Sequence, residues 1–126
     1  MLNILVVDDS MIMRRNIKKY LTSLGHNIIG EAQNGEEAIL FCQENNPDLI
    51  TMDISMSGIS GIEVVQKIKE LNSDFSIIMI TAYGKNSLVK EALQSGAKGY
   101  ILKPVSEENL YESIGKIYPK YSNTTK

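Results

Sequence analysis

The sequence predicts a doubly wound α/β fold, in which five helices cover a parallel sheet of five strands. Short apolar runs alternate five times with longer amphipathic segments, at about 20 to 25 residues per unit. The first and third runs both end on acidic residues, Asp8-Asp9 and Asp53. Because ligands bind at the carboxyl ends of strands in open α/β sheets, these acids predict a site there. The 126 residues, 43% of them hydrophobic, suffice for one domain.

Composition argues against several classes of function. The net charge of −2, without a run of Lys or Arg, argues against nucleic-acid binding by this chain alone. Cys42 is the only cysteine, which excludes an internal disulfide, and we expect it to be a small core residue. The first residues lack the basic segment of a signal peptide, and their apolar run is too short to span a membrane. We expect a cytoplasmic monomer without membrane insertion.

Five short apolar runs are predicted to form the strands. In chain order they comprise residues 2–7, 27–32, 48–52, 76–80 and 99–102. The first run is rich in β-branched residues, which is typical of a strand buried on both faces. The third run is bounded by Pro47 and by a Ser/Gly cluster, which indicates a buried strand that ends at Asp53.

Capping residues mark where the helices between these strands begin and end. The predicted N-caps are Ser10, Asn34, Ser60 and Ser106, and the fourth helix is expected over about residues 86–95. Glu37 and Glu63 each follow a cap by three residues, which is the spacing of a capping box. Gly25 and Gly96 are expected to end the first and fourth helices.

The end of the chain and the single histidine are expected to be peripheral. The last helix is predicted to end near Ile117, so we expect a folded domain of residues 1–119. Residues 120–126 are polar apart from one Tyr and are expected to fray. His26 stands alone after Gly25, so we expect an exposed turn residue and not a metal ligand or phosphorelay histidine.

The acidic strand ends form a set of hard oxygen ligands. Asp8, Asp9 and Asp53 suit Mg²⁺ better than a softer metal, and a cation among them would relieve their mutual repulsion. The alternative is that they are helix caps or loop acids. Lys103 ends the fifth strand at the same edge, where it would offset the acids or bind an anion. Thr81 adds a hydroxyl to that edge. A surface lysine and a turn threonine are the alternatives.

Five segments carry a resemblance that spans essentially the whole chain. They are residues 6–10 with Met13-Arg14-Arg15, residues 52–56, Ile80-Thr81-Ala82, Gly96-Ala97 and Lys103-Pro104. These motifs are specific in combination, and through them the sequence resembles the receiver domain of two-component response regulators, most closely the single-domain regulators of chemotaxis. The resemblance implies a flavodoxin-like sheet with strand order 2-1-3-4-5.

The resemblance also implies a role for each site residue. Asp53 would accept a phosphoryl group from a sensor histidine kinase. The Mg²⁺ ligands would be Asp8, Asp9, Asp53 and the backbone carbonyl of Ser55. Lys103 and Thr81 would bind the phosphoryl group, Thr81 and Tyr100 would be the switch residues, and the bond before Pro104 would be cis. A downstream protein would dock on the fourth helix, fifth strand and fifth helix.

Two residues depart from the family pattern. Ser57 stands where receivers commonly have Pro, and Ser60 stands where they often have Asp or Asn. Without the Pro we expect a looser loop over residues 55–60, which would affect kinetics because no proposed ligand side chain is lost. Ser55 and Tyr83 occupy positions that in this family influence how water reaches the acyl phosphate.

The leading hypothesis is a binding module whose affinity for a partner changes when Asp53 is phosphorylated, in chemotaxis or motility. It would catalyse only its own phosphorylation and dephosphorylation. A phosphorelay intermediate, or a regulator outside chemotaxis, is an alternative within the family. A Mg²⁺-dependent phosphatase of the haloacid-dehalogenase kind would need an Asp at Ser55, and a flavodoxin-like FMN carrier would need a phosphate cradle in place of Asp8-Asp9. The intact site argues against a degenerate, constitutive receiver.

Overall fold

Five parallel strands form one sheet in the computed structural model, which describes residues 1–54, 60–82 and 87–122. The strands are β1 (Asn3–Val7), β2 (Asn27–Ala32), β3 (Leu49–Asp53), β4 (Ile77–Thr81) and β5 (Gly99–Leu102). Their order across the sheet is β2-β1-β3-β4-β5, which is the order that the resemblance implies. The strand bounds lie within one residue of the predicted ones.

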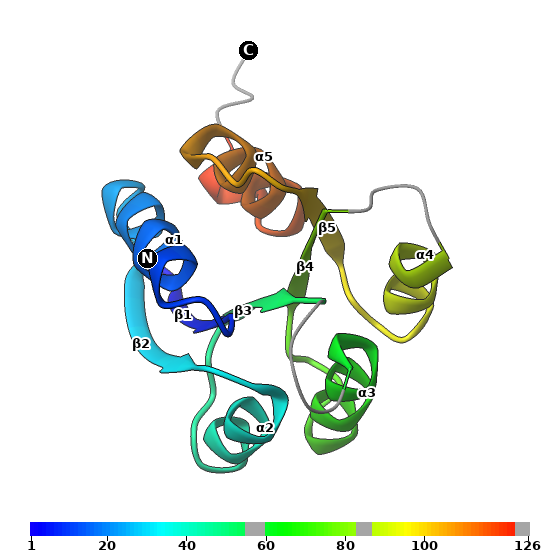
Figure 1. The fold of residues 1–126 in the computed structure, drawn as a ribbon. Coiled ribbons are helices and arrows are strands. Elements are labelled where there is room, and N and C mark those ends of the chain that lie inside the picture. Colours follow the sequence, from blue (N-terminus) through cyan, green and yellow to red (C-terminus); the bar gives the residue numbers. More distant parts are fainter. Residues whose placement is uncertain (55–59, 83–86, 123–126) are drawn as a thin grey trace.

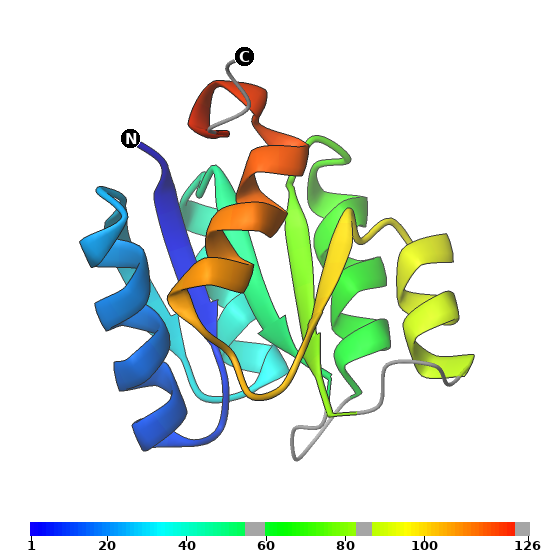
Figure 2. The same ribbon diagram turned by 90° about the horizontal axis from the view of Figure 1, so that it is seen from above.

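Helices cover both faces of this sheet. They are α1 (Met11–Ser23), α2 (Gly35–Glu44), α3 (Gly61–Leu71), α4 (Ser87–Gln94) and α5 (Glu107–Ile117), followed by the short 3₁₀ helix η1 (Pro119–Tyr121). Figure 1 shows α1 and α5 on one face and α2, α3 and α4 on the other. Figure 2 shows the strands running side by side behind α1 and α5. Within the described ranges, no helix has the length and apolar character needed to cross a membrane.

The four predicted N-caps are confirmed, whereas the Glu37 side chain accepts from Gln33 N and not from its cap residue. Ser10 Oγ accepts a hydrogen bond from Met13 N at 3.2 Å, and Asn34 Oδ1 accepts one from Glu37 N at 2.8 Å. At the start of α3, Ser60 Oγ accepts from Glu63 N, so the serine that departs from the family pattern serves as a helix cap. A complete capping box lies at α5, where Ser106 Oγ accepts from Asn109 N and Asn109 Oδ1 accepts from Ser106 N.

The core consists of two apolar layers, one on each face of the sheet. Ile4 and Val6 of β1 face the layer that includes side chains of α1 and α5. Leu5 and Val7 face the layer that α2, α3 and α4 cover. Burying an aliphatic side chain of this size stabilises the fold by about 1.5 to 3 kcal/mol. The β-branched and apolar character of the central strands is therefore explained by burial on both faces, as predicted.

His26 is buried, which corrects the expectation of an exposed turn residue. The residue is 7% exposed, and its Nδ1 accepts a hydrogen bond from Leu2 N at 3.1 Å. The Tyr121 ring packs edge-on against the imidazole, with 5.0 Å between ring centroids. Burial lowers the pKa of His26, and the nearby N-terminal ammonium lowers it further. His26 therefore contacts residues near both ends of the described chain, Leu2 just before β1 and Tyr121 in η1.

The segment after α5 also differs from the expectation. Residues 120 and 121 belong to η1, and Tyr121 packs against the layer of α1 and α5. Before η1, the Tyr118 hydroxyl donates to the Asp48 carbonyl at 2.6 Å. These contacts place 120–122 on the body of the domain, beyond the expected boundary at residue 119. Residues 123–126 of the expected frayed tail lie outside the described residues.

Candidate functional site

The three acidic residues meet at the carboxyl edge of the sheet. Asp53 is the last residue of β3, and Asp8 and Asp9 follow β1, which pairs with β3 in parallel. Each of the three carboxylates offers an oxygen atom within 4.8 Å of the others. Asp8 and Asp53 are buried, at 1% and 2% exposure, whereas Asp9 is exposed. The sequence prediction that these residues converge is therefore confirmed.

Asp8 has a buried oxygen that could bind a cation. Its Oδ1 accepts a hydrogen bond from Ser10 N at 2.9 Å. Its Oδ2 is buried and has no hydrogen-bond partner in the part of the chain that the structure describes. Burial raises the pKa of Asp8, although the Ser10 hydrogen bond and the charge of Lys103 oppose that effect. An unpartnered carboxylate oxygen beside two further carboxylates fits a hard divalent ion that takes oxygen ligands.

A close backbone approach supports the position of Asp53. A Cβ atom added at Gly61, the first residue of α3, would lie 2.9 Å from Ile54 Cα and 3.0 Å from the Asp53 carbonyl oxygen. Contacts that short would force the backbone apart. Glycine at this position therefore allows the start of α3 to lie directly against the end of β3.

Lys103 supplies a positive charge to the same edge. It follows β5, and its Nζ lies 3.5 Å from Asp53 Oδ1. Its backbone N–H donates to the Thr81 carbonyl at 2.8 Å, which fixes the chain as it leaves β5. The Lys103–Pro104 peptide bond is cis, as expected. A lysine that forms an ion pair with a buried carboxylate is not the solvated surface lysine of the alternative interpretation.

The other predicted residues lie at different distances from the acids. Thr81 ends β4 and is buried at the same edge of the sheet. Tyr100 is in β5 opposite Met79, two residues before the end of the strand, and is 42% exposed. Ser55 lies outside the described residues, as do Ser57 and Tyr83. The structure therefore gathers Asp8, Asp9, Asp53, Lys103 and Thr81 at one edge, and Tyr100 lies farther along the sheet.

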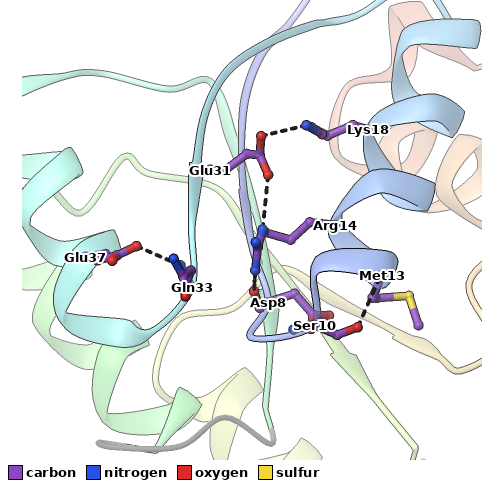
Figure 3. Close-up of polar contacts among 8 residues, drawn as sticks. All are labelled: Asp8, Ser10, Met13, Arg14, Lys18, Glu31, Gln33 and Glu37. Atoms are coloured by element: carbon purple, nitrogen blue, oxygen red, sulfur yellow. Dashed lines mark hydrogen bonds and ion pairs between the residues drawn. The ribbon is translucent and has the colours of Figure 1, made fainter.

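Arg14 contacts this site, although no sequence pattern assigned it a role there. Its Nη1 donates to the Asp8 carbonyl at 2.5 Å, and its Nε donates to Glu31 Oε1 at 3.0 Å (Figure 3). A positive charge in the first turn of a helix opposes the helix dipole. Arg15 shares this position, so the sequence alone did not single out Arg14, and the contact with Asp8 is found only in the structure.

Known proteins are similar in sequence to this chain over most of its length. The family model of the response regulator receiver domain matches residues 4–115. The chemotaxis protein CheY of Bacillus subtilis (strain 168) is 42% identical over 113 residues, which cover 90% of this chain and 94% of that protein. CheY of Thermotoga maritima is 37% identical over 114 residues, which cover 90% of this chain and 95% of that protein.

A solved structure supports the same relationship. The structure of the CheX-CheY-BeF3-Mg²⁺ complex from Borrelia burgdorferi contains a chain that is 36% identical to this one, with a TM-score of 0.88. The match covers 92% of this chain and 88% of that chain. The family match, the two relatives and the shared fold agree, and the chain belongs to the family of response regulator receiver domains.

Proposed function

We propose that this protein is a signalling switch of the cytoplasm that accepts a phosphoryl group on Asp53 from a sensor histidine kinase. The proposal rests on the residues that surround Asp53. A buried carboxylate at the end of a strand lies 3.5 Å from a lysine ammonium and close to two further carboxylates. This arrangement suits an acid that reacts with an anionic group, because positive charge is available on one side and cation ligands on the other.

In the proposed reaction, a carboxylate oxygen of Asp53 attacks the phosphorus atom of a phosphohistidine. An O–P bond forms as the N–P bond breaks, and the imidazole nitrogen leaves with the electron pair. Lys103 then pairs with the transferred phosphoryl oxygens. Bound Mg²⁺ would supply the positive charge that lets these oxygens approach the acids. Asp8, Asp9, Asp53 and the backbone carbonyl of Ser55 are its proposed ligands.

In this proposal, Thr81 and Tyr100 respond to phosphorylation and transmit the change to the docking face. The Thr81 hydroxyl lies at the end of β4 and donates to a phosphoryl oxygen, which draws its loop inward. Tyr100 is exposed in β5, beside a hollow of about 370 Å³ that is also lined by Leu102, Glu112 and Lys116. A change at Thr81 therefore alters the face formed by α4, β5 and α5, where the downstream protein docks.

The named relatives favour chemotaxis or motility as the pathway. Two relatives that span nearly the whole chain are chemotaxis proteins. The structural relative from Borrelia burgdorferi is in a complex with CheX. We infer that this chain likewise acts by docking to other proteins and catalyses only its own phosphorylation and dephosphorylation. A strain without it should swim but fail to follow gradients, whereas normal chemotaxis would favour a phosphorelay regulator.

The direct test is phosphorylation by acetyl phosphate, followed by intact-mass spectrometry. We expect one phosphoryl adduct that requires Mg²⁺, is absent in Asp53→Asn and is strongly reduced in Asp9→Ala. Asp74→Asn is the matched control, because Asp74 is an exposed acid in the loop between α3 and β4. That variant should be labelled like the wild type. Equal labelling of the wild type and Asp53→Asn would disprove the assignment of the phosphoacceptor.

A further inference from the structure

A chain of charged contacts connects the acidic site to the outer strand of the sheet. Arg14 of α1 donates through Nη1 to the Asp8 carbonyl and through Nε to Glu31 of β2 (Figure 3). Lys18, one turn farther along α1, contacts the other oxygen of Glu31 at 2.6 Å. The Arg14 side chain is only 11% exposed. The Glu31 side chain is 40% exposed, so of the two contacts the partly buried one with the Asp8 carbonyl is the less screened by water.

Arg14 contacts the backbone carbonyl of Asp8, and this contact affects the orientation of two carboxylates, those of Asp8 and Asp9. The Asp8 carbonyl belongs to the peptide unit that joins Asp8 to Asp9. Because a peptide unit is planar, fixing this oxygen also fixes the nitrogen and the Cα atom of Asp9. The Asp8 N–H is held at the same time by the Ala32 carbonyl at 3.1 Å. The backbone that carries both acids is thus held from β2 on one side and by Arg14 on the other.

The contact also leaves the carboxylate oxygens available. A guanidinium that paired with the acids themselves would neutralise them and compete with a cation. Arg14 donates to a backbone carbonyl, and Asp8 Oδ2 keeps no hydrogen-bond partner among the described residues. Glu31 offsets the positive charge of Arg14 and holds its planar group in one orientation.

We propose that Arg14 is a positioning residue for the cation site, which orients Asp8 and Asp9 through their shared peptide unit while Glu31 holds its guanidinium in place. The proposal rests on the proposed function, because it assumes that these acids bind Mg²⁺. Residues that orient metal ligands commonly change metal affinity by about 10- to 100-fold when they are removed. Arg14 is expected to have an effect at the lower end, about tenfold, because Asp8 keeps its other hydrogen bonds.

The test is a calorimetric titration of Mg²⁺ alone into the whole chain, without a phosphoryl donor. Arg14→Ala should weaken Mg²⁺ binding about tenfold. Lys18→Ala is the matched control, because Lys18 contacts the same Glu31 but does not contact Asp8, and it should bind Mg²⁺ like the wild type. The Mg²⁺ affinity of Glu31→Gln should lie between those of the two variants, since this substitution removes the charge that holds Arg14.

A second measurement separates positioning from general stability. Thermal unfolding in EDTA reports the stability of each variant without metal, and the increase in Tm on adding Mg²⁺ reports binding. Arg14→Ala should show a smaller increase than Lys18→Ala, whatever its stability in EDTA. If Arg14→Ala does not fold, Arg14→Gln replaces it with the same expectation, because its shorter amide cannot reach both partners.

Wild-type Mg²⁺ affinity in the folded Arg14 variant would overturn the proposal for Arg14 and leave the proposed function intact. An equal loss in Lys18→Ala would also overturn it, because the effect would then come from the contacts with Glu31 that both side chains make and not from the contact with Asp8. Absence of Mg²⁺ binding in the wild-type chain would instead contradict the proposed function. The two failures are therefore distinguishable in one set of titrations.

Discussion

Asp8 carries a buried carboxyl whose second oxygen has no hydrogen-bond partner among the described residues. Such a group disfavours folding when no cation compensates it. Asp8→Asn should therefore raise the stability of the metal-free protein at neutral pH by about 1 kcal/mol. The same substitution should abolish most of the stabilisation that Mg²⁺ provides. Chemical denaturation in EDTA and in Mg²⁺ measures both effects.

The pH dependence of this difference provides a control. Burial raises the pKa of Asp8 above its ordinary value of 3.8. The folded protein therefore holds this proton more tightly than the unfolded chain, and the associated stability is present below pH 3.8 and lost as the pH rises through the raised pKa. The advantage of Asp8→Asn in EDTA should accordingly shrink towards acidic pH. An advantage that does not change with pH would contradict this account.

Single residues of the site were predictable where their role depends on their place at a strand end. Asp8, Asp53 and Lys103 follow apolar runs, and parallel strands bring such ends together. Arg14 and His26 were not predictable in this way. Their roles depend on Glu31 and on Leu2 and Tyr121, which lie far from them in sequence and become neighbours only in the folded sheet.

At the scale of elements, β5 connects the site to the proposed docking face. Tyr100 lines both the hollow beside Leu102 and a second hollow of about 260 Å³ beside Leu93 of α4. We predict that beryllofluoride with Mg²⁺ shifts the NMR signals of the Tyr100 ring and of the α4 amides. The shift should be a change in populations of Tyr100 rotamers, because its size is limited by the difference in phosphoryl-group interactions between the two states.

Two controls make this prediction specific. The Tyr118 hydroxyl contacts the Asp48 carbonyl just before β3, at the amino end of the strand and away from the acids. The signals of the Tyr118 ring should therefore stay in place. Asp53→Asn with beryllofluoride should leave the Tyr100 signals unchanged. If the wild-type Tyr100 and α4 signals stay in place while those around Asp53 move, the output face lies elsewhere.

Elements were predictable to the extent that local residues determine them. Helix caps depend on residues three positions apart, so Ser10, Asn34 and Ser106 marked their helices correctly. The segment after α5 has few local signals, and it is held by contacts of Tyr118 and Tyr121 with distant parts of the chain. Composition alone therefore suggested a frayed end where the structure has η1.

At the scale of the whole molecule, His26 links stability to pH. Its folded pKa lies below its ordinary value of 6.5, because burial disfavours the charged imidazole and the N-terminal ammonium is close. The unfolded chain therefore takes up this proton first as the pH falls, and the stability present above pH 6.5 is lost below it. We predict that the unfolding free energy falls between about pH 7.5 and 5.5, by at most about 1.4 kcal/mol per pH unit.

His26→Gln is the matched variant, because its amide oxygen can accept the hydrogen bond from Leu2 without titrating. Its unfolding free energy should vary less over the same pH range. Urea denaturation at several pH values measures both proteins. Parallel pH profiles would show that another group is responsible.

The fold class was predictable because alternating apolar runs and capped amphipathic segments permit few other arrangements. The order of the strands was not determined by these patterns. A parallel strand can pair with a neighbour that is distant in sequence, and β1 pairs with both β2 and β3. The order therefore came from the resemblance, which contains information about contacts that periodicity lacks.

The sheet also divides the molecule into halves that can change independently over evolutionary time. Alternate residues of β1 belong to separate apolar layers, so side chains of α1 and α5 lie in a different cluster from those of α2, α3 and α4. Substitutions at positions that lie far apart and share no contacts have nearly additive effects on stability. Descendants of this chain can therefore repack one layer without a compensating change in the other. A lineage that acquires a new partner on one face can keep the opposite face as it was.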